Sequence, residues 1–79
     1  MKTYVFEVEV VEEDDGRWSA TIPTLPGCNA WGNSQREALE AIRENAQAFV
    51  EVLLEHGDPL PEAARGTPEI QAPAVAVNV

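Results

Sequence analysis

The side chains of this sequence that are best suited to catalysis or metal binding are carboxylates. Glu7 and Glu9 lie on one predicted strand. Glu40 and Glu44 lie on a predicted helix. Hydrolysis assisted by two metal ions needs several such groups converging within a few Å of the ions. Strand alternation places Glu7 and Glu9 on the face away from the helix, so the sequence predicts no catalytic residue, no metal site and no cofactor.

Cys28 and His56 are the other candidates, as a nucleophile and its base. Nothing in the pattern supplies a third group to orient the histidine, and His56 falls at the predicted end of a helix, where its charge would complement the helix dipole. Structural roles are therefore favoured for both. Because Cys28 is the only cysteine, an internal disulfide and a thiolate-rich metal site are excluded. With no apolar run of membrane-spanning length and no leader-like N-terminus, the sequence predicts a reduced, cytoplasmic protein outside the membrane.

Length and charge narrow the possible functions further. The 79 residues suffice for one small domain, and 14 acidic against 5 basic residues give a net charge of −9. Five scattered basic residues argue against direct DNA binding, which depends on neutralising phosphates. An acidic chain is instead suited to bind a basic protein, because complementary electrostatic fields raise the rate of association.

Two features are candidates for such a contact. The acidic segment 12–15 is either a patch that meets a basic partner or a solvated hairpin tip. Trp31 is a candidate interface anchor, whereas Trp18 shares the period of the core face and is expected to be buried. The 23–28 loop either turns a corner or presents Leu25 to a partner. The candidate partner-binding residues are Glu12, Glu13, Asp14, Asp15, Leu25 and Trp31.

Alternating hydrophobicity predicts the strands that position these residues. In the segment 4–11, one face toward a core would carry Tyr4, Phe6, Val8 and Val10. Asp15-Gly16 is a hairpin signal, and a second strand should follow over 18–22. The prolines and glycine of the 23–28 loop end that strand, and a short third strand is expected over 28–31.

A long helix should follow, with Ser34 as its N-cap, Glu37 as the capping-box partner and Gly57 as its stop. Its expected apolar stripe is Leu39, Ile42, Ala46, Phe49 and Leu53. The C-terminal part of the helix is more apolar than one sheet face needs, which suggests contact with another subunit. The segment 62–73 is expected to be a loop, and 74–79 a last strand that adds to its own sheet or to a neighbour's. The candidate oligomer-interface residues are Phe49, Val50, Leu53, Leu54, Val75 and Val77.

These elements predict an α+β fold, an antiparallel sheet in the order β-β-β-α-β with one long helix packed on one face. Residues 1–61 would form the domain. Residues 62–79, a loop and a short strand, would complete it or pair with a neighbour.

Four motifs in order carry a family resemblance: Gly16-Arg17-Trp18-Ser19-Ala20, Ile22-Pro23-Thr24-Leu25-Pro26-Gly27-Cys28, Gly32-Asn33-Ser34-Gln35-Arg36-Glu37-Ala38 and Gly57-Asp58-Pro59-Leu60-Pro61. In these motifs the chain resembles the HicB-like antitoxins of type II toxin-antitoxin systems. The resemblance implies a truncated ribonuclease-H-like fold, homodimeric or homotetrameric assembly, and neutralisation of a basic, mRNA-cleaving HicA-like toxin by direct binding.

Longer antitoxins of this type often carry a C-terminal DNA-binding module. Residues 62–79 show no pattern for such a module, so we expect a stand-alone homologue that lacks it. The alternative function is an orphan homo-oligomeric binding module that has no toxin partner.

Overall fold

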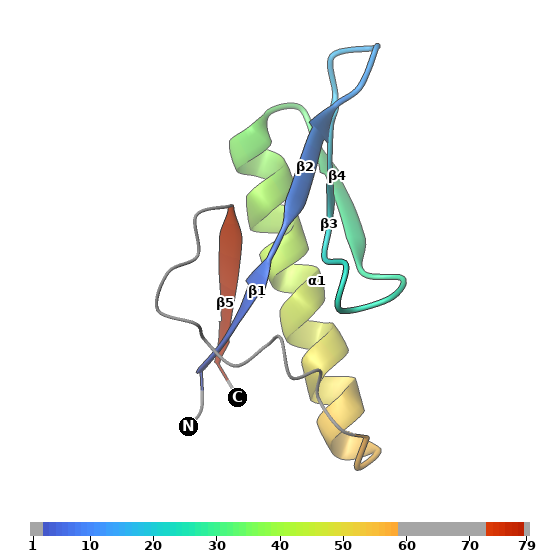
Figure 1. Ribbon diagram of the computed structural model, residues 1–79, viewed down its shortest axis with the longest axis vertical. Coiled ribbons are helices and arrows are strands. Elements are labelled where there is room, and N and C mark those ends of the chain that lie inside the picture. The colour runs from blue at the N-terminus through green and yellow to red at the C-terminus, as the bar shows by residue number, and fades with distance from the viewer. Residues whose placement is uncertain (1–2, 59–72, 79) are drawn as a thin grey trace.

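One long helix lies against an antiparallel sheet in the computed structural model, which describes residues 3–58 and 73–78 (Figure 1). In chain order the elements are β1 (Thr3–Glu7), β2 (Glu9–Glu12), β3 (Trp18–Thr21), β4 (Asn29–Gly32), α1 (Gln35–Glu55) and β5 (Ala74–Asn78). The expected α+β fold, with antiparallel strands and one helix on one face, is confirmed. The expected division at residues 61 and 62 lies outside the described residues.

The first strand is divided, contrary to the single strand predicted over 4–11. β1 pairs with β5 and β2 pairs with β3, both antiparallel. The change of partner falls at Val8, whose N–H donates to the carbonyl of Pro73 over 2.8 Å, while Glu9 already faces Thr21. The strands thus form a two-stranded sheet, β1-β5, and a three-stranded sheet, β2-β3-β4. Since β5 and β3 pair along opposite edges of the run from β1 to β2, β5 and β4 are the outermost strands.

The hairpin predicted at Asp15-Gly16 joins β2 to β3. The Glu13 N–H donates to the carbonyl of Arg17 over 2.7 Å, and the Gly16 N–H donates to the carbonyl of Glu13 over 2.9 Å. Gly16 has φ +88°, a conformation that glycine adopts without steric cost. The local signal was therefore sufficient to predict this turn.

The helix begins and ends as predicted. Ser34 Oγ accepts a hydrogen bond from the Glu37 N–H over 3.1 Å, and Glu37 Oε2 accepts one from the Asn33 N–H over 2.7 Å. At the other end His56 is the C-cap, and Gly57, at φ +73°, stops the helix. The signals that begin and end the helix are therefore supplied by residues close to its ends in the sequence.

The core lies between α1 and the inner face of the sheet. Its helical contribution is a row four residues apart, namely Ala38, Ile42, Ala46 and Val50. Three residues of the predicted stripe, Leu39, Phe49 and Leu53, flank this row and are only partly buried. The two alanines allow the helix to approach the strands closely, which is why the larger side chains lie beside the line of contact. Trp18 packs against the core as its period predicts, but it is only partly buried.

Candidate protein-binding surfaces

The face of the sheet opposite α1 carries a row of side chains across three strands, with a hydrophobic residue at each end. Val11 of β2 faces Ser19 of β3, which in turn faces Trp31 of β4. Val11 is 53% exposed and Trp31 is 52% exposed. Strand alternation directs these three side chains away from the helix. We call Val11, Ser19 and Trp31 the outer row.

Arg17 and Asp15 fix the environment of Trp31. The Arg17 guanidinium lies over the indole ring, with Cζ 5.1 Å from the ring centroid. Asp15 Oδ2 accepts a hydrogen bond from Arg17 Nε over 2.8 Å, and Oδ1 accepts one from the Arg17 backbone N–H over 3.0 Å. The backbone N–H, and then the guanidinium, lower the pKa of Asp15 below its ordinary value. Trp31 is thus exposed yet held on one side by a restrained arginine.

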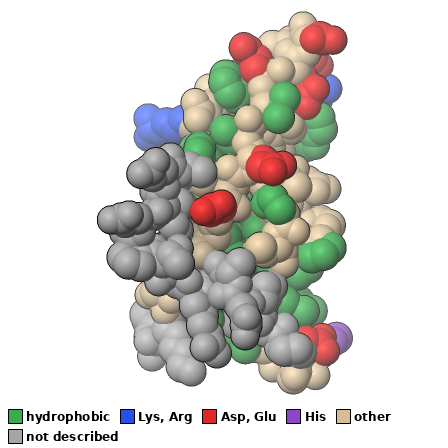
Figure 2. Space-filling view, in the orientation of Figure 1, with side chains coloured by type: hydrophobic (Ala, Val, Ile, Leu, Met, Phe, Trp, Pro, Cys, Tyr) green, Lys and Arg blue, Asp and Glu red, His purple; other side chains and the backbone are tan. Residues whose placement is uncertain are grey.

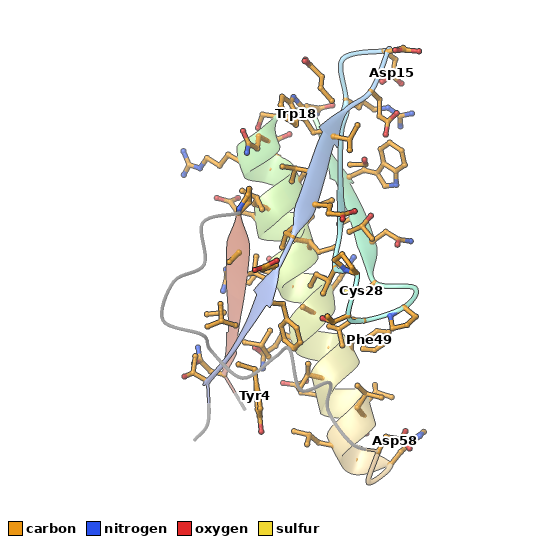
Figure 3. All side chains as sticks on the ribbon, in the orientation of Figure 1. Tyr4, Asp15, Trp18, Cys28, Phe49 and Asp58 are labelled. Atoms are coloured by element: carbon orange, nitrogen blue, oxygen red, sulfur yellow. The ribbon has the colours of Figure 1, made fainter. Side chains whose placement is uncertain are left out.

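The predicted acidic cluster divides into two pairs. Glu13 Oε1 accepts a hydrogen bond from Ser19 Oγ over 3.0 Å, and Asp15 holds Arg17, so these two carboxylates stabilise the hairpin. Glu12 and Asp14 are exposed and form no hydrogen bond or ion pair with the described residues. Acidic side chains gather at the hairpin end of the visible face in Figure 2, and Figure 3 places Asp15 at the tip. Glu13 and Asp15 therefore act within the hairpin itself, whereas contact of Glu12 and Asp14 with a basic partner stays a prediction.

The loop 23–28 turns a corner and does not present Leu25 to a partner. Leu25 is 1% exposed and belongs to the core. Its N–H donates to the carbonyl of Ile22 over 3.0 Å, and the Cys28 N–H donates to its carbonyl over 2.9 Å. These two turns direct Leu25 inward, so the idea that it contacts a partner is wrong.

The C-terminal half of α1 carries the second apolar surface. Leu54 is 45% exposed and Val52 is 50% exposed, while Phe49 and Leu53 are partly buried. A groove of about 390 Å³ lies between this part of the helix and residues 27–29. Three of the predicted oligomer-interface residues, Val50, Val75 and Val77, are instead buried in the core of the chain itself. Helix and strand periodicity turn them inward.

The candidate catalytic and metal-binding side chains do not form a site among the described residues. Cys28 is 3% exposed, and burial raises the pKa of its thiol, which opposes nucleophilic chemistry. His56 caps the helix. Over residues 3–58 and 73–78, no group of three or more His, Cys, Asp or Glu side chains is arranged to hold a metal ion. Nor does α1, the helix of this described part, have the length and apolarity needed to cross a membrane.

Two helix amides that the sequence reading did not single out hold the two outermost strands. Asn45 Nδ2 donates to the carbonyl of Asn29 on β4 over 2.8 Å. Gln47 Nε2 donates to the carbonyl of Asn78 on β5 over 2.6 Å, and Gln47 Oε1 accepts from the Asn78 N–H over 3.3 Å. Polar residues two apart on a predicted amphipathic helix were the available signal, but helical periodicity alone does not identify a hydrogen-bond partner for them.

Comparison with known proteins gives consistent matches over most of the chain. A family model described as the HicB-like antitoxin of bacterial toxin-antitoxin systems matches residues 4–76. A UPF0150 protein of Thermoplasma acidophilum is 34% identical over 56 residues, which are 71% of this chain and 81% of that protein. A UPF0150 protein of Synechocystis is 32% identical over 59 residues, 75% of each chain.

Solved structures share the fold. The N-terminal domain of the Burkholderia pseudomallei antitoxin HicB is 27% identical with a TM-score of 0.64, over 99% of this chain and 98% of that one. The longer HicB chain of the same organism is 26% identical with a TM-score of 0.63, over 100% of this chain and 64% of that one. A HicA3 and HicB3 toxin-antitoxin complex contains a chain with a TM-score of 0.54 at 20% identity, over 98% of this chain and 96% of that one.

Proposed function

The chain belongs to the HicB-like antitoxin family, and from this membership we propose that it neutralises a basic, RNA-cleaving HicA-like toxin by binding to it directly. The match over residues 4–76 is the observation that carries the proposal. Neutralisation would occur by covering the toxin's RNA-binding surface, with no bond made or broken by this chain. The protein would thus be a non-enzymatic inhibitor.

The outer row and the hairpin are the surface that best fits such a partner. Among the described residues, five carboxylates lie on or beside this surface, at Glu9, Glu12, Glu13, Asp14 and Asp15, together with the guanidinium of Arg17. A negative field of this kind steers a basic partner toward the surface and disfavours acidic ones. The outer row offers apolar area within that field, so charge would guide the encounter and Trp31 would anchor the complex.

The restraint on Trp31 favours its role as an anchor. Binding hot spots are enriched in tryptophan, and an anchor that is already ordered loses less conformational entropy on binding. Arg17 restrains the indole in the unbound protein, and Asp15 restrains Arg17. Trp31→Ala should therefore weaken toxin binding by about 2 kcal/mol or more, a factor of roughly 30.

The test begins with a search for a small basic reading frame beside this gene. Its product is then co-expressed with this chain, and the result is scored by growth and by co-elution on size exclusion. We expect rescue of growth and a stable complex with the natural sequence, and a complex weakened by a factor of roughly 30 with Trp31→Ala. The matched control is Leu54→Ala, an exposed apolar residue on the helix, which should retain the complex. If the natural sequence neither rescues growth nor co-elutes, the toxin-neutralising function is refuted and the orphan binding module is favoured.

A further inference from the structure

We propose that Asp15-Gly16, at the tip of the hairpin, is a site at which the chain rearranges to isoaspartate, and that the side chain of Arg17 slows this reaction in the folded protein. The proposal concerns the covalent chain alone and does not depend on a toxin. It rests on the identity of the two residues, on the hydrogen bonds at the two reacting groups and on the exposure of the turn.

The reaction is an attack by the backbone nitrogen of Gly16 on Cγ of Asp15. A C–N bond forms and a C–O bond breaks, and the hydroxyl of the protonated carboxyl group leaves with the amide proton of Gly16 as water. A second water molecule then opens the resulting cyclic imide at either of its carbonyls. One opening restores aspartate, and the other leaves the backbone running through Cβ and Cγ. Water is the co-reactant, and the mass of the chain is unchanged.

Asp15 is the aspartate of this sequence whose neighbour best permits the attack. Asp58 precedes a proline, which has no N–H to lose. Asp14 precedes Asp15, whose side chain crowds the attacking nitrogen. Asp15 precedes Gly16, which has no Cβ, and beyond its chain neighbours no described residue comes within 4 Å of a Cβ built there. The Asp15 side chain is 52% exposed at the hairpin tip, so water reaches it (Figure 3).

The folded hairpin holds both reacting groups. The Gly16 N–H donates to the carbonyl of Glu13 over 2.9 Å, and the nitrogen must leave this bond to attack. Asp15 Oδ2 accepts from Arg17 Nε over 2.8 Å, and Oδ1 accepts from the Arg17 backbone N–H over 3.0 Å. Both bonds favour the charged carboxylate, whereas the protonated carboxyl group is the form that loses a hydroxyl readily. The lowered pKa of Asp15 agrees with this arrangement. The fold therefore opposes the reaction at the nucleophile and at the carboxyl group.

The side chain of Arg17 can be removed without removing the turn. It is 57% exposed, and backbone bonds hold the turn itself, from the Glu13 N–H to the carbonyl of Arg17 and from the Gly16 N–H to the carbonyl of Glu13. Trp31 also keeps the guanidinium beside the carboxylate, with its ring centroid 5.1 Å from Arg17 Cζ. Without the side chain, Asp15 still accepts from the backbone N–H of residue 17. The protection that Arg17 supplies is therefore partial, and its removal can be measured in a folded chain.

The rearranged hairpin would differ from the natural one at the surface that carries Trp31. An isoaspartyl linkage lengthens the backbone between residues 15 and 16 by a carbon atom and attaches the free carboxylate directly to Cα. The bonds from Arg17 to Asp15 depend on the natural length of this backbone. The product therefore releases the guanidinium, and with it the restraint on Trp31.

The experiment follows isoaspartate formation in the full chain, both folded and in urea, at one pH and temperature. Cleavage after glutamate, liquid chromatography and mass spectrometry locate the product, because isomerisation leaves the mass of a peptide unchanged whereas deamidation of an asparagine raises it. Arg17→Ala is compared with Arg43→Ala, which removes the same charge from the helix. Circular dichroism establishes that each variant is folded.

We expect the folded natural chain to react at Asp15 about tenfold or more slowly than the chain in urea, because several hydrogen bonds must break before the attack. Folded Arg17→Ala should react about two- to fivefold faster than the folded natural chain, which is the contribution expected of an exposed ion pair. Arg43→Ala should match the natural chain. In urea all three chains should react at the same rate, because the protection belongs to the fold.

Two further measurements need no change at Arg17 and keep the proposal testable if Arg17→Ala unfolds. The first is the comparison of the natural chain folded and in urea. The second is Gly16→Ala in urea, which should react more slowly because a Cβ hinders the nitrogen. Equal rates for the natural chain in the two states would overturn the proposal, as would a folded Arg17→Ala that reacts no faster than the natural chain. So would isoaspartate that forms at Asp14 before Asp15. A failure of toxin binding leaves these rates unaffected, so the two proposals can fail separately.

Discussion

Gly32, the last residue of β4, is the position where a single added methyl group should harm the fold most directly. A Cβ built there would lie 2.4 Å from the backbone N of Ala38 and 2.7 Å from the backbone C of Glu37. Ordinary contacts of a Cβ begin near 3.4 Å, so β4 and the first turn of α1 would have to separate by about 1 Å (3.4 − 2.4). Backbone atoms cannot rotate away as a side chain does. A glycine is needed at position 32 because the backbones of β4 and α1 are in contact there and leave no room for a Cβ atom.

The cost of Gly32→Ala follows from this geometry. Forcing extra volume into a packed contact costs about 1–3 kcal/mol. The separation also pulls on the capping box of Ser34 and Glu37, whose loss costs about 1 kcal/mol. We therefore expect the free energy of unfolding to fall by roughly 2–4 kcal/mol, out of about 4–12 kcal/mol for a chain of this length. The melting temperature should fall by about 8–30 °C.

Urea unfolding followed by circular dichroism measures this change, and Gly16→Ala is the matched control. Gly16 has φ +88° but nothing within 4 Å of a built Cβ, so its substitution brings only backbone strain of about 1–2 kcal/mol. Gly32→Ala should be the more damaging of the two. If Gly32→Ala unfolds at the same urea concentration as Gly16→Ala, or at a higher one, the steric argument is incorrect.

Four further outcomes are expected. Ile42→Ala empties a fully buried site and should lower the unfolding free energy by about 2–5 kcal/mol in urea titrations, with an unchanged m-value. Ser34→Ala should cost about 0.5–2 kcal/mol in the same assay, and a negligible loss would show that the cap is dispensable. An NMR titration should place the pKa of Asp15 below 3.8, so the stabilisation from this carboxylate is present above that pH and is lost as the pH falls through the lowered pKa. Arg17→Ala should raise this pKa only part of the way, because the backbone N–H remains. Cys28 should react with thiol reagents far more slowly in the folded protein than in urea, and equal rates would contradict its burial.

Features set by residues close together in the chain could be predicted from the sequence. The Asp15-Gly16 turn and the Ser34 and Glu37 capping box each depend on groups within a few positions of each other, and both are present. In each case the interaction that decides the structure spans only a few residues.

Features that depend on contacts between distant segments could not be predicted. The break at Val8 arises because the strand changes partner, to a segment more than sixty residues further along the chain. The inward turn of Leu25 and the contact of Gly32 with α1 depend on where the loop and the helix lie in space. The contact of Arg17 with Trp31 likewise joins the hairpin to β4. Strand alternation predicts which face of the sheet a side chain lies on, but it does not predict which residue of another segment that side chain contacts.

The pairing of β1 with β5 has a mechanical consequence. Thr3 faces Asn78 in the register, and Thr3 Oγ1 donates to Asn78 Oδ1 over 2.7 Å. A pulling force applied between these two residues would load the end of the pair first and peel its hydrogen bonds apart one after another. Attachment at Thr3 and Glu55 would instead load many contacts at once. An optical-trap measurement should therefore record a much lower rupture force in the first geometry than in the second.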